Sequence, residues 1–475
     1  MLSEIALAVL IPGWQARRRR RWLAIALFGA GVVAPLAVGV YALVSGRNWV
    51  ALTLDSGYLA WMMFAGILAV LARLAAVSEV WFVNRPDRSW KPGDGWSIAL
   101  VVAVCAPMLI GVVQVGRARA AIAPAFAGEP AAPLFDASAT TTSTVTSTTT
   151  TVAPQAAPST TVEDAPTTTV GPTTTTTSVR PKPERPQSGV DPALVADVTN
   201  VLLLGGDAGP DRSGLRTDTM MLFSLHQPSG RASLVSIPRD LHGLLFPPGT
   251  ALEERYPYGF TEIANAVYPI VSSRPELRAA YEVEGVRPGV VATAQAIGYS
   301  LDVTIHDYVL IDMQGFLELI DALGGVTVDV PKVLPMPGNV PGARTQYPDT
   351  IGPGLIHMDG TTALGYVRSR KADSDYQRTA RQRHLLEALA TQISFNDVAL
   401  RFSRVASAIG GTLRTSLTPD ELAEMLSVIG GQTAIVESVG LVPPLVDMKR
   451  PDFGEMARIV GAVRLALATG QPSGY

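Results

Sequence analysis

Three long apolar stretches dominate the first quarter of the chain. They run from Trp22 to Gly46, from Ser56 to Val77 and from Gly95 to Gly116, and the second contains the single charge among them, Arg73. Each approaches or exceeds the roughly 20 residues that a helix needs to cross a bilayer. Buried helices of a soluble domain are the alternative, but such helices usually keep a polar stripe. The pattern therefore predicts three transmembrane helices over residues 22–116.

Basic residues in the connecting loops predict how these helices are oriented. Five consecutive arginines, Arg17 to Arg21, precede the first stretch, and three more basic residues lie between the second and the third. The loop after the first stretch carries only Arg47. Cytoplasmic loops collect Lys and Arg. We therefore expect the basic segment 1–21 in the cytoplasm and, after three crossings, every later residue on the outer side of the membrane.

The composition changes after the third stretch. Residues 117–190 are rich in Thr, Ser, Pro and Ala, with few large apolar side chains. A segment of this kind buries too little apolar surface to offset its conformational entropy. We predict a disordered linker outside the cytoplasm, a stalk that spans roughly 45 Å as a coil and up to about 190 Å in the polyproline II conformation.

Globular patterning begins at Asp191, where apolar runs alternate with Gly, Pro and Asp. The predicted strands are Val201–Leu204, Thr219–Leu225, Ala232–Ile237, Val303–Ile311, Val326–Val330 and Gly365–Arg370. The predicted helices are Gln314–Leu323, Asp375–Ile393, Val398–Ile409, Pro419–Ile429 and Phe453–Leu467. Because strands and helices alternate, we expect residues 191–475 to form an α/β or α+β sandwich with a central mixed sheet flanked by helices.

Charge and cysteine content exclude several classes of function. The whole chain has a net charge of −3, but residues 191–475 carry 23 Lys and Arg against 31 Asp and Glu, a net charge of −8. Nucleic-acid-binding surfaces are usually basic, so no nucleic acid partner is expected. Cys105 is the only cysteine, which rules out an intramolecular disulfide and a zinc site made of cysteines. The motifs GxxxxGK[ST], GxSxG and HExxH are absent from the sequence.

Six basic residues gather within sixteen positions of this acidic domain. They are Arg368, Arg370, Lys371, Arg378, Arg381 and Arg383. Arg368 and Arg370 are two apart on the predicted strand and would share a face, and Arg378 and Arg381 are neighbours on the surface of the following helix. Guanidinium groups that converge in this way suit a phosphate, which arginine binds bidentately. A solvated basic helix with ordinary surface ion pairs is the alternative.

Three aspartates lie at the ends of predicted strands. Asp207 follows a Gly-Gly turn after the first strand, Asp218 begins the second, and Asp240 follows Arg239 where the third one ends. Strand ends are where α/β sheets place ligand sites. Two nearby carboxylates together with a diphosphate suit Mg²⁺, which binds through a few carboxylates and substrate oxygens. Ordinary turn capping is the alternative for Asp207 and Asp218.

At these residues the chain resembles the LytR-CpsA-Psr family, extracytoplasmic enzymes that attach polyprenyl-pyrophosphate-linked glycopolymers to peptidoglycan. The matching stretches, in family order, are Leu202–Asp207, Arg216–Leu222, Ser233–Asp240, Asn265–Tyr268, Asp312–Phe316, Ala322–Pro331, Gly365–Arg370, Asp373–Asp375 and Arg378. No single stretch is specific, but the set is. The resemblance implies an enzyme that moves a glycopolymer phosphate from a polyprenyl-pyrophosphate carrier to a sugar hydroxyl of peptidoglycan and releases polyprenyl phosphate.

The same resemblance implies roles for the matching positions. It makes Asp207 and Asp218 ligands of Mg²⁺. The residues it implies for pyrophosphate binding are Arg216, Arg239, Arg368, Arg370 and Arg378, and the clustering of basic residues adds Arg381. The residues it implies for catalysis are Arg239, Arg370, Arg378, Asp240 and Asp375, with the two aspartates as candidates for proton transfer. Family members also hold the prenyl chain in an apolar tunnel between the sheet and the helices.

Two departures from the family pattern change which basic residues are expected to bind phosphate. Gly209 stands where many members carry an arginine, and Ile263 stands where many carry a lysine. The hold on phosphate would therefore depend more on the later arginines. Three membrane helices in place of the more usual one are a further variation, which leaves the expected outer location of the domain unchanged.

Two other functions compete with the transferase interpretation. A non-catalytic envelope sensor or wall-binding module would use the same basic cleft to hold an anionic polymer or prenyl phosphate, and it would require neither magnesium nor release of polyprenyl phosphate. A transcription regulator would need the domain in the cytoplasm, on the opposite side of the membrane from the one that the basic loops predict.

Overall fold

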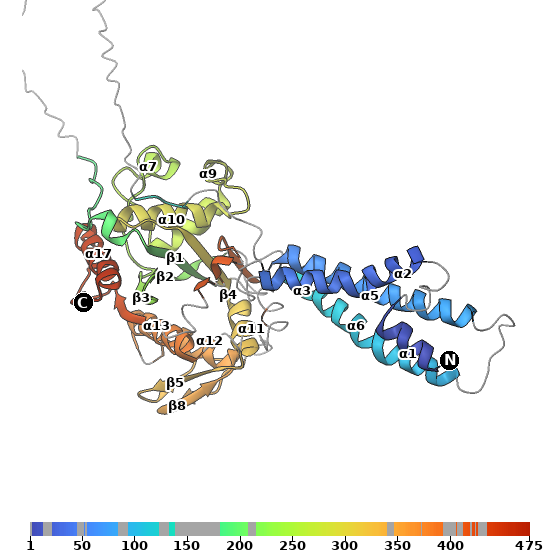
Figure 1. Cartoon of the computed structure of the whole chain (residues 1–475). Coiled ribbons are helices and arrows are strands. Elements are labelled where there is room, and N and C mark those ends of the chain that lie inside the picture. The colour runs from blue at the N-terminus through green and yellow to red at the C-terminus, as the bar shows by residue number, and fades with distance from the viewer. Residues whose placement is uncertain are drawn as a thin grey trace, which may run out of the picture.

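The structure is a computed structural model, and it describes most of the chain. The described residues are 2–12, 21–44, 52, 55–83, 94–122, 133–137, 181–207, 215–339, 346–371, 373–392, 405, 412–418, 420–422, 424–425 and 435–475. They form a helical bundle near the N-terminus and an α/β domain in the second half of the chain, as Figure 1 shows.

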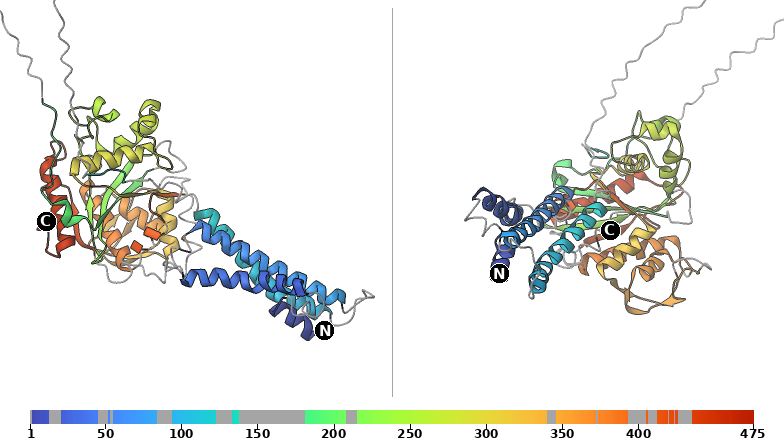
Figure 2. Two further views of the ribbon diagram at one scale, coloured as in Figure 1. Left: turned by 45° about the horizontal axis from the view of Figure 1, so that its top comes forward. Right: turned by 90° about the vertical axis from the view of Figure 1, so that its right-hand side faces the viewer.

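The bundle consists of long apolar helices. Its elements are α1 (Leu2–Leu10), α2 (Arg21–Phe28), the π-helical turn η2 (Gly29–Val33), α3 (Ala34–Val44), α5 (Ser56–Val83) and α6 (Asp94–Ile122). Three segments are long and apolar enough to cross a membrane: Trp22–Val44, Gly57–Trp81 and Ala99–Arg117. These segments lie side by side in both views of Figure 2, and most of their surface is exposed apolar side chain. The three predicted apolar helices are therefore present, and each is a candidate membrane span.

A six-stranded mixed sheet forms the centre of the α/β domain. Its strands, in spatial order, are β10 (Ile435–Gly440), β3 (Arg231–Ser236), β2 (Thr217–His226), β1 (Val198–Gly206), β4 (Asp307–Asp312) and β9 (Leu413–Thr415). β1 pairs with β4 and β10 with β3 in parallel, whereas the other pairs are antiparallel. The predicted mixed sheet is confirmed.

Helices cover both faces of the sheet (Figure 1). One layer contains α8 (Val267–Ser273), α10 (Pro288–Leu301) and α17 (Phe453–Thr469), and the other contains α11 (Met313–Leu323), α12 (Gly360–Arg368) and α13 (Asp375–Gln392). Shorter elements beside the first layer are η3 (Pro192–Val195), α7 (Ala251–Arg255), η4 (Ala264–Ala266) and α9 (Pro275–Ala280). Side chains alternate along the strands, so Leu202 and Leu204 of β1 face the first layer and Val201 faces the second.

Two small hairpins extend the second layer. β5 (Val326–Val330) pairs with β8 (Gly354–Met358), and β6 (Leu334–Pro335) pairs with β7 (Thr350–Ile351). Their buried residues share one apolar cluster with those of α12 and α13. The hairpins thereby fix the loop that joins α12 to α13, which carries part of the candidate site described below.

One predicted element is wrong and two lie mostly outside the described residues. The segment Gly365–Arg370, predicted as a strand, is instead the end of helix α12 and the turn after it. Asp359 begins this helix by accepting a hydrogen bond from the Thr362 backbone N–H at 2.7 Å. The predicted helices Val398–Ile409 and Pro419–Ile429 fall largely on residues that the structure does not describe.

The predicted linker 117–190 needs correction at both ends. Helix α6 continues to Ile122, beyond the predicted end of the third span. Residues 133–137 and 181–190 are described, and both segments contact the α/β domain. The prediction for residues 138–180 lies outside the described part of the chain.

Candidate anion-binding site at the end of the sheet

A cavity of about 350 Å³ lies between the sheet and the second helical layer. Its apolar walls include Leu203 and Val309 of the sheet, Phe316 of α11, Leu364 of α12 and Leu389 of α13. Its polar part lies at the carboxyl ends of β1 and β4 and at the start of α13, where four arginines and three aspartates line it. These residues are Arg239, Arg368, Arg370, Arg378, Asp207, Asp218 and Asp312. One cavity thus joins a charged mouth to an apolar interior.

The turn after β1 positions the first aspartate. The backbone N–H of Asp207 donates to the Arg216 carbonyl at 3.0 Å, and its Oδ1 accepts from the Arg216 N–H at 2.8 Å. Gly206 precedes it, and a Cβ at this glycine would lie 2.7 Å from a methyl group of Leu215. The two chain segments therefore pack closely here, and Asp207 lies at the mouth of the cavity.

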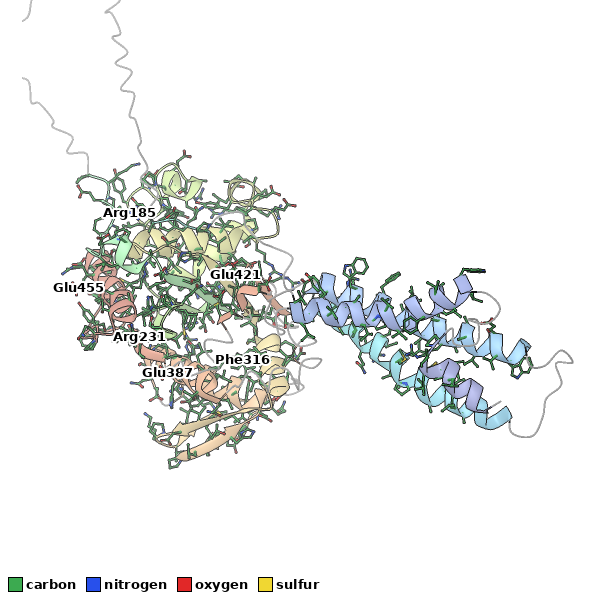
Figure 3. All side chains as sticks on the ribbon, in the orientation of Figure 1. Arg185, Arg231, Phe316, Glu387, Glu421 and Glu455 are labelled. Carbon is green, nitrogen blue, oxygen red and sulfur yellow. The ribbon has the colours of Figure 1, made fainter. Side chains whose placement is uncertain are left out.

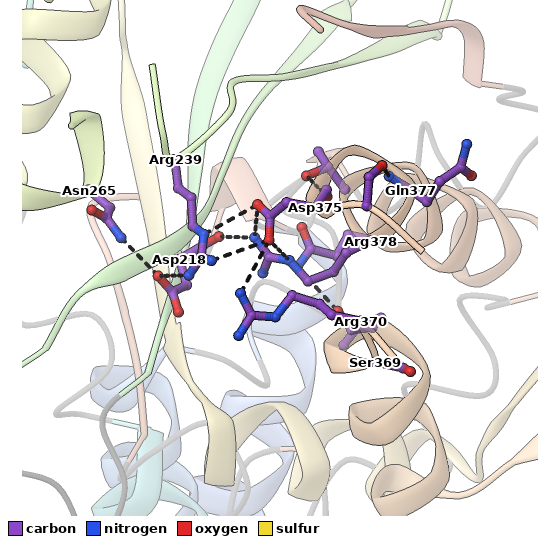
Figure 4. Close-up of polar contacts among 12 residues, drawn as sticks. Asp218, Arg239, Asn265, Ser369, Arg370, Asp375, Gln377 and Arg378 are labelled. Atoms are coloured by element: carbon purple, nitrogen blue, oxygen red, sulfur yellow. Dashed lines mark hydrogen bonds and ion pairs between the residues drawn. The ribbon is translucent and has the colours of Figure 1, made fainter. Parts of the chain in front are cut away.

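Asp375, the first residue of α13, connects three arginines from different parts of the domain (Figure 4). The Arg378 Nη2 donates to its Oδ2 at 2.9 Å and the Arg378 Nε to its Oδ1 at 3.1 Å. Arg239, from the segment after β3, donates to the two oxygens at 3.2 and 3.3 Å. Arg370 Nη1 lies 3.7 Å from Oδ1. A single carboxylate therefore fixes the positions of these guanidinium groups.

Asp218 connects two of these arginines, Arg239 and Arg378, to β2. Its Oδ1 accepts from Arg239 Nη1 and from Asn265 Nδ2, each at 2.9 Å, and its backbone carbonyl accepts from Arg378 Nη2 at 3.4 Å. Asn265 is only 2% exposed. In the sequence, Asn265 is recognisable only as part of a stretch that matches the family. Its role at Asp218 is not predictable there, because the two residues are 47 positions apart along the chain.

The electrostatics of this cluster keep its members ionised. Burial alone would raise the pKa of Asp375, but the hydrogen bonds and charges of Arg378 and Arg239 outweigh burial and lower the pKa below its ordinary value. Burial likewise lowers the pKa of Arg239, but Asp218 and Asp375 more than offset this and raise it. The mouth of the cavity therefore carries fixed positive charges held by carboxylates, an arrangement that suits a polyvalent anion.

The structure separates the predicted site residues into two groups. Asp207, Asp218, Arg239, Arg368, Arg370 and Arg378 line the cavity, and Asp375 stands directly behind three of them. Of the three arginines that contact Asp375, Arg370 is the most accessible, with 58% of its side chain exposed. Arg368 donates to the Tyr347 hydroxyl at 3.0 Å. Arg239, Arg370 and Arg378 therefore converge on one carboxylate at the cavity.

Three other predicted residues do not occur among the described residues that line the cavity: Arg216, Asp240 and Arg381. The Arg216 side chain is exposed. Arg381 pairs with Asp373 at 2.7 Å and donates to the carbonyls of Tyr366 and Ser369, so it joins α13 to the end of α12. Asp240 Oδ1 is buried without a hydrogen-bond partner among the described residues. The geometry thus assigns Arg381 a structural contact instead of a place in the mouth.

The residues at the mouth fit a magnesium ion only if the ligand shares in binding it. No group of three or more His, Cys, Asp or Glu side chains suited to a metal occurs in the described part of the chain. Asp207 and Asp218 nevertheless line one cavity, and Asp218 Oδ2 has no hydrogen bond to any described residue. Magnesium accepts a site of one or two carboxylates completed by phosphate oxygens and water. A diphosphate would supply those oxygens.

Together, the fold and the site define an α/β domain, in a chain with three candidate membrane spans, whose cavity is lined by arginines and aspartates at one end and by apolar side chains elsewhere. The chain belongs to the LytR_cpsA_psr family, whose model matches residues 167–442, more than half of the chain. The resemblance seen in the sequence is therefore confirmed.

Two relatives illustrate the similarity. The chain is 28% identical over 240 residues to the polyisoprenyl-teichoic acid–peptidoglycan teichoic acid transferase TagU of Oceanobacillus iheyensis, a match that covers 50% of this chain and 64% of that protein. It is 27% identical over 246 residues to the TagU of Halalkalibacterium halodurans, covering 51% and 69%. The chain thus matches less than two thirds of the length of the Oceanobacillus protein.

Solved structures show a more distant similarity. The crystal structure of TagV from B. subtilis has a TM-score of 0.42 and 21% identity, and the match covers 57% of this chain and 97% of TagV. A structure of TagT bound to LIIa-WTA has a TM-score of 0.39 and 21% identity, covering 60% and 97%.

Proposed function

We propose that the domain transfers a glycopolymer phosphate from a polyprenyl-pyrophosphate carrier to a sugar hydroxyl of peptidoglycan, on the outer side of the cytoplasmic membrane. The observation that carries the proposal is the single cavity with arginines at its mouth and apolar side chains inside. A prenyl diphosphate has the same two parts in the same order. The names of the TagU relatives, which describe transfer from a polyisoprenyl carrier to peptidoglycan, support the choice of reaction.

The arginines would bind the diphosphate and stabilise charge as the bond to the leaving group breaks. In the proposed step the acceptor hydroxyl oxygen forms a bond to the phosphorus nearest the glycan, and the bond from that phosphorus to the bridging oxygen breaks. Polyprenyl phosphate leaves with the electron pair. Arg239 and Arg378 reach the mouth already oriented by Asp375, so little reorganisation is needed when charge develops.

The two candidates for proton transfer are not equivalent. Asp375 has a lowered pKa and both of its oxygens accept hydrogen bonds from arginines, so it is a weak base and its contribution is to orient Arg239 and Arg378. Asp240 lies outside the cavity lining, among the described residues. A loose transition state for phosphoryl transfer depends mainly on positioning and charge stabilisation. We therefore assign the acceptor proton to solvent or to a carboxylate at the mouth.

Magnesium, held by Asp207 and Asp218, would neutralise charge on the diphosphate when bound. Asn265 and Arg239 hold Asp218 Oδ1, which leaves Oδ2 directed away from both donors. Asp207 is held by the backbone of Arg216. These contacts give both carboxylates a defined position before any ligand binds.

The proposal is tested with the full chain in membrane vesicles and a polyprenyl-diphosphate glycan donor. We expect release of polyprenyl phosphate and attachment of the glycan to peptidoglycan, both abolished by a chelator and restored by Mg²⁺. Asp207→Ala, Arg239→Ala and Arg378→Ala should each lower turnover by about 100-fold or more. The matched control is Arg458→Ala, which removes an exposed arginine paired with Glu455 on α17.

Two outcomes would contradict the proposal. Donor binding without release of polyprenyl phosphate would favour the wall-binding or sensor module. Undiminished turnover in all three variants would remove the site assignment. The side of the membrane is tested separately by a reporter fused after Tyr475, because activity confined to the cytoplasm would contradict the outer location.

A further inference from the structure

Two short segments on either side of residues 138–180 meet on the α/β domain. Residues 133–137 lie along the chain that leads into β4: the Phe135 N–H donates to the Ile305 carbonyl at 3.2 Å, and the Ile305 N–H donates back to the Phe135 carbonyl at 2.9 Å. The Ala137 N–H donates to Thr304 Oγ1 at 3.0 Å. Leu134 is buried in the main core of the domain. Residues 133–137 are therefore part of the α/β domain and pair with the chain segment that precedes β4.

Arg185 joins the second segment to the first. Its Nη2 donates to the Ala137 carbonyl at 2.6 Å and to Asp302 Oδ1 at 2.8 Å. Its guanidinium lies 5.9 Å from the centre of the Phe135 ring and 5.7 Å from that of Tyr299. One side chain thus contacts both segments and the end of α10.

Asp302 is the fixed point of this arrangement. It ends α10 in the left-handed conformation, with a φ of 49°, which a residue other than glycine adopts only when its surroundings hold it there. Its second oxygen, Oδ2, accepts from the Ser188 N–H at 2.8 Å. Phe135 packs directly on the same helix, because a Cβ at Gly298 would overlap its ring. We call Phe135, Ala137, Arg185, Ser188 and Asp302 the clasp.

The clasp lies at the end of the sheet opposite the cavity mouth. Asp302 to Ile305 precede β4, whereas the mouth lies where β4 ends, at Asp312. Figure 3 shows Arg185 beside α10, and Phe316 of the cavity wall lies on the other side of the sheet. The chain therefore leaves the domain after Ala137 and returns to it by residue 181 at one place, away from the mouth.

We propose that the clasp converts the Thr-rich segment 138–180 from a stalk into a side loop, so that residues 123–132 alone tether the domain to the membrane helices. Between Ile122 and residue 133 the extended chain spans about 40 Å at most. The predicted stalk would have reached about 190 Å. The clasp thus sets how far the domain can move from the bilayer, whatever the length of the Thr-rich segment.

The length of this tether matches the distance between the clasp and the mouth of the cavity. The nine residues of β1 span about 30 Å between the clasp end and the mouth. A tether of about 40 Å is just long enough to pass alongside the domain and let the mouth reach lipid headgroups. This consequence rests on the proposed function, whereas the clasp itself does not.

The test measures the distance of the domain from a bilayer. The full chain, with Cys105→Ser and Leu355→Cys, is labelled with a donor dye at position 355, which is 77% exposed in the wild type. It is placed in vesicles of phosphatidylglycerol and phosphatidylcholine that carry an acceptor-labelled lipid. One flexible insert, as long as segment 138–180, is added either within 138–180 or within 123–132. We expect energy transfer to fall only for the insert in 123–132.

Breaking the clasp should remove this difference. With Phe135→Ala and Arg185→Ala combined, the insert in 138–180 should lower energy transfer as well. Lys182→Ala is the matched control, because it removes an ion pair of the same segment with Glu253 and leaves the clasp intact. Hydrogen exchange of the β1 amides shows whether each variant is folded. Equal loss of energy transfer from both inserts in the unbroken protein would overturn the proposal, and it would leave the transferase proposal standing.

Discussion

The two faces of the central sheet have the same apolar pattern but different packing. The face under α10 and α17 is filled: Leu202, Leu222, Ile297 and Val460 are at most 1% exposed and belong to one continuous core. The face under α11 and α13 contains the cavity, whose walls are side chains of the same apolar kinds. The first face is filled throughout, whereas the second holds both a buried cluster that includes Val201 and Leu234 and a cavity with room for a ligand.

The difference shows that apolar residues in an α/β sandwich serve two purposes. On the filled face each side chain gains the full free energy of burial and dispersion. On the hollow face some of that gain is lost, because atoms that border a void have fewer neighbours. A ligand with a long apolar group would restore the missing contacts. The hollow face should therefore be less stable without ligand and more tolerant of substitution.

Two buried arginines, one on each face, give the largest expected contrast. Arg378 is 6% exposed and faces the cavity, whereas Arg464 of α17 is 8% exposed on the filled face. Arg378→Met removes the donor to Asp375 and should lower turnover by about 100-fold or more. Burial lowers the pKa of Arg464 to about 10, and its Nε has no hydrogen-bond partner among the described residues.

Arg464→Met should therefore keep full turnover and equal or higher stability, since it removes a charge that burial disfavours and a buried N–H without a partner, and puts an apolar side chain in their place. Transfer assays and denaturant unfolding of both variants check the pair. The same loss of turnover in both would show that the two faces do not differ in function.

Truncations of apolar residues give an intermediate contrast. Ile297→Ala on the filled face should lower the free energy of unfolding by about 2 to 5 kcal/mol, because it opens a void in a close-packed core. Leu389→Ala in the cavity wall should lower it by less than half as much, since this half-buried side chain already borders empty space. Chemical denaturation without ligand measures both. Equal losses would mean that the cavity closes in solution.

This contrast explains what the sequence predicts and what it does not. The strands and helices that bear strong apolar patterns lie close to their predicted bounds, for example Val326–Val330 and Phe453–Thr469. The same pattern describes a filled face and a hollow one, so the cavity is not visible in it. The sequence predicts a strand at Gly365–Arg370, whereas the structure has the end of a helix there that begins at the cap Asp359. Tyr366 and Val367 favour strands locally, and this local preference does not determine the structure.

Within the site, the sequence predicts which residue types gather but not which of them pair with one another. Arg378 and Arg381 are three apart on one helix, so the sequence predicts that they act together. In the structure Arg378 bonds to Asp375 and Asp218, and Arg381 bonds to Asp373 and α12. Spacing along a helix determines the side on which each arginine side chain lies. The residue that each arginine pairs with depends on how the helices pack against one another, and the sequence pattern does not show this packing.

The smallest expected effect is on the pH dependence of stability, and it concerns Asp375 at the cavity. The arginine pairs lower the pKa of Asp375 against the opposing effect of burial, so its folded pKa lies below its ordinary value of 3.8. A depressed folded pKa contributes stability that is fully present above the unfolded pKa and is lost as the pH falls through the folded pKa. The stability gap between wild type and Asp375→Asn should therefore stay constant from pH 7 to about 5 and shrink below about 4. Thermal unfolding across this range measures the gap. A gap that already shrinks near pH 6 would contradict the depressed pKa and, with it, the role of Asp375 as the permanently charged partner of the arginines at the mouth.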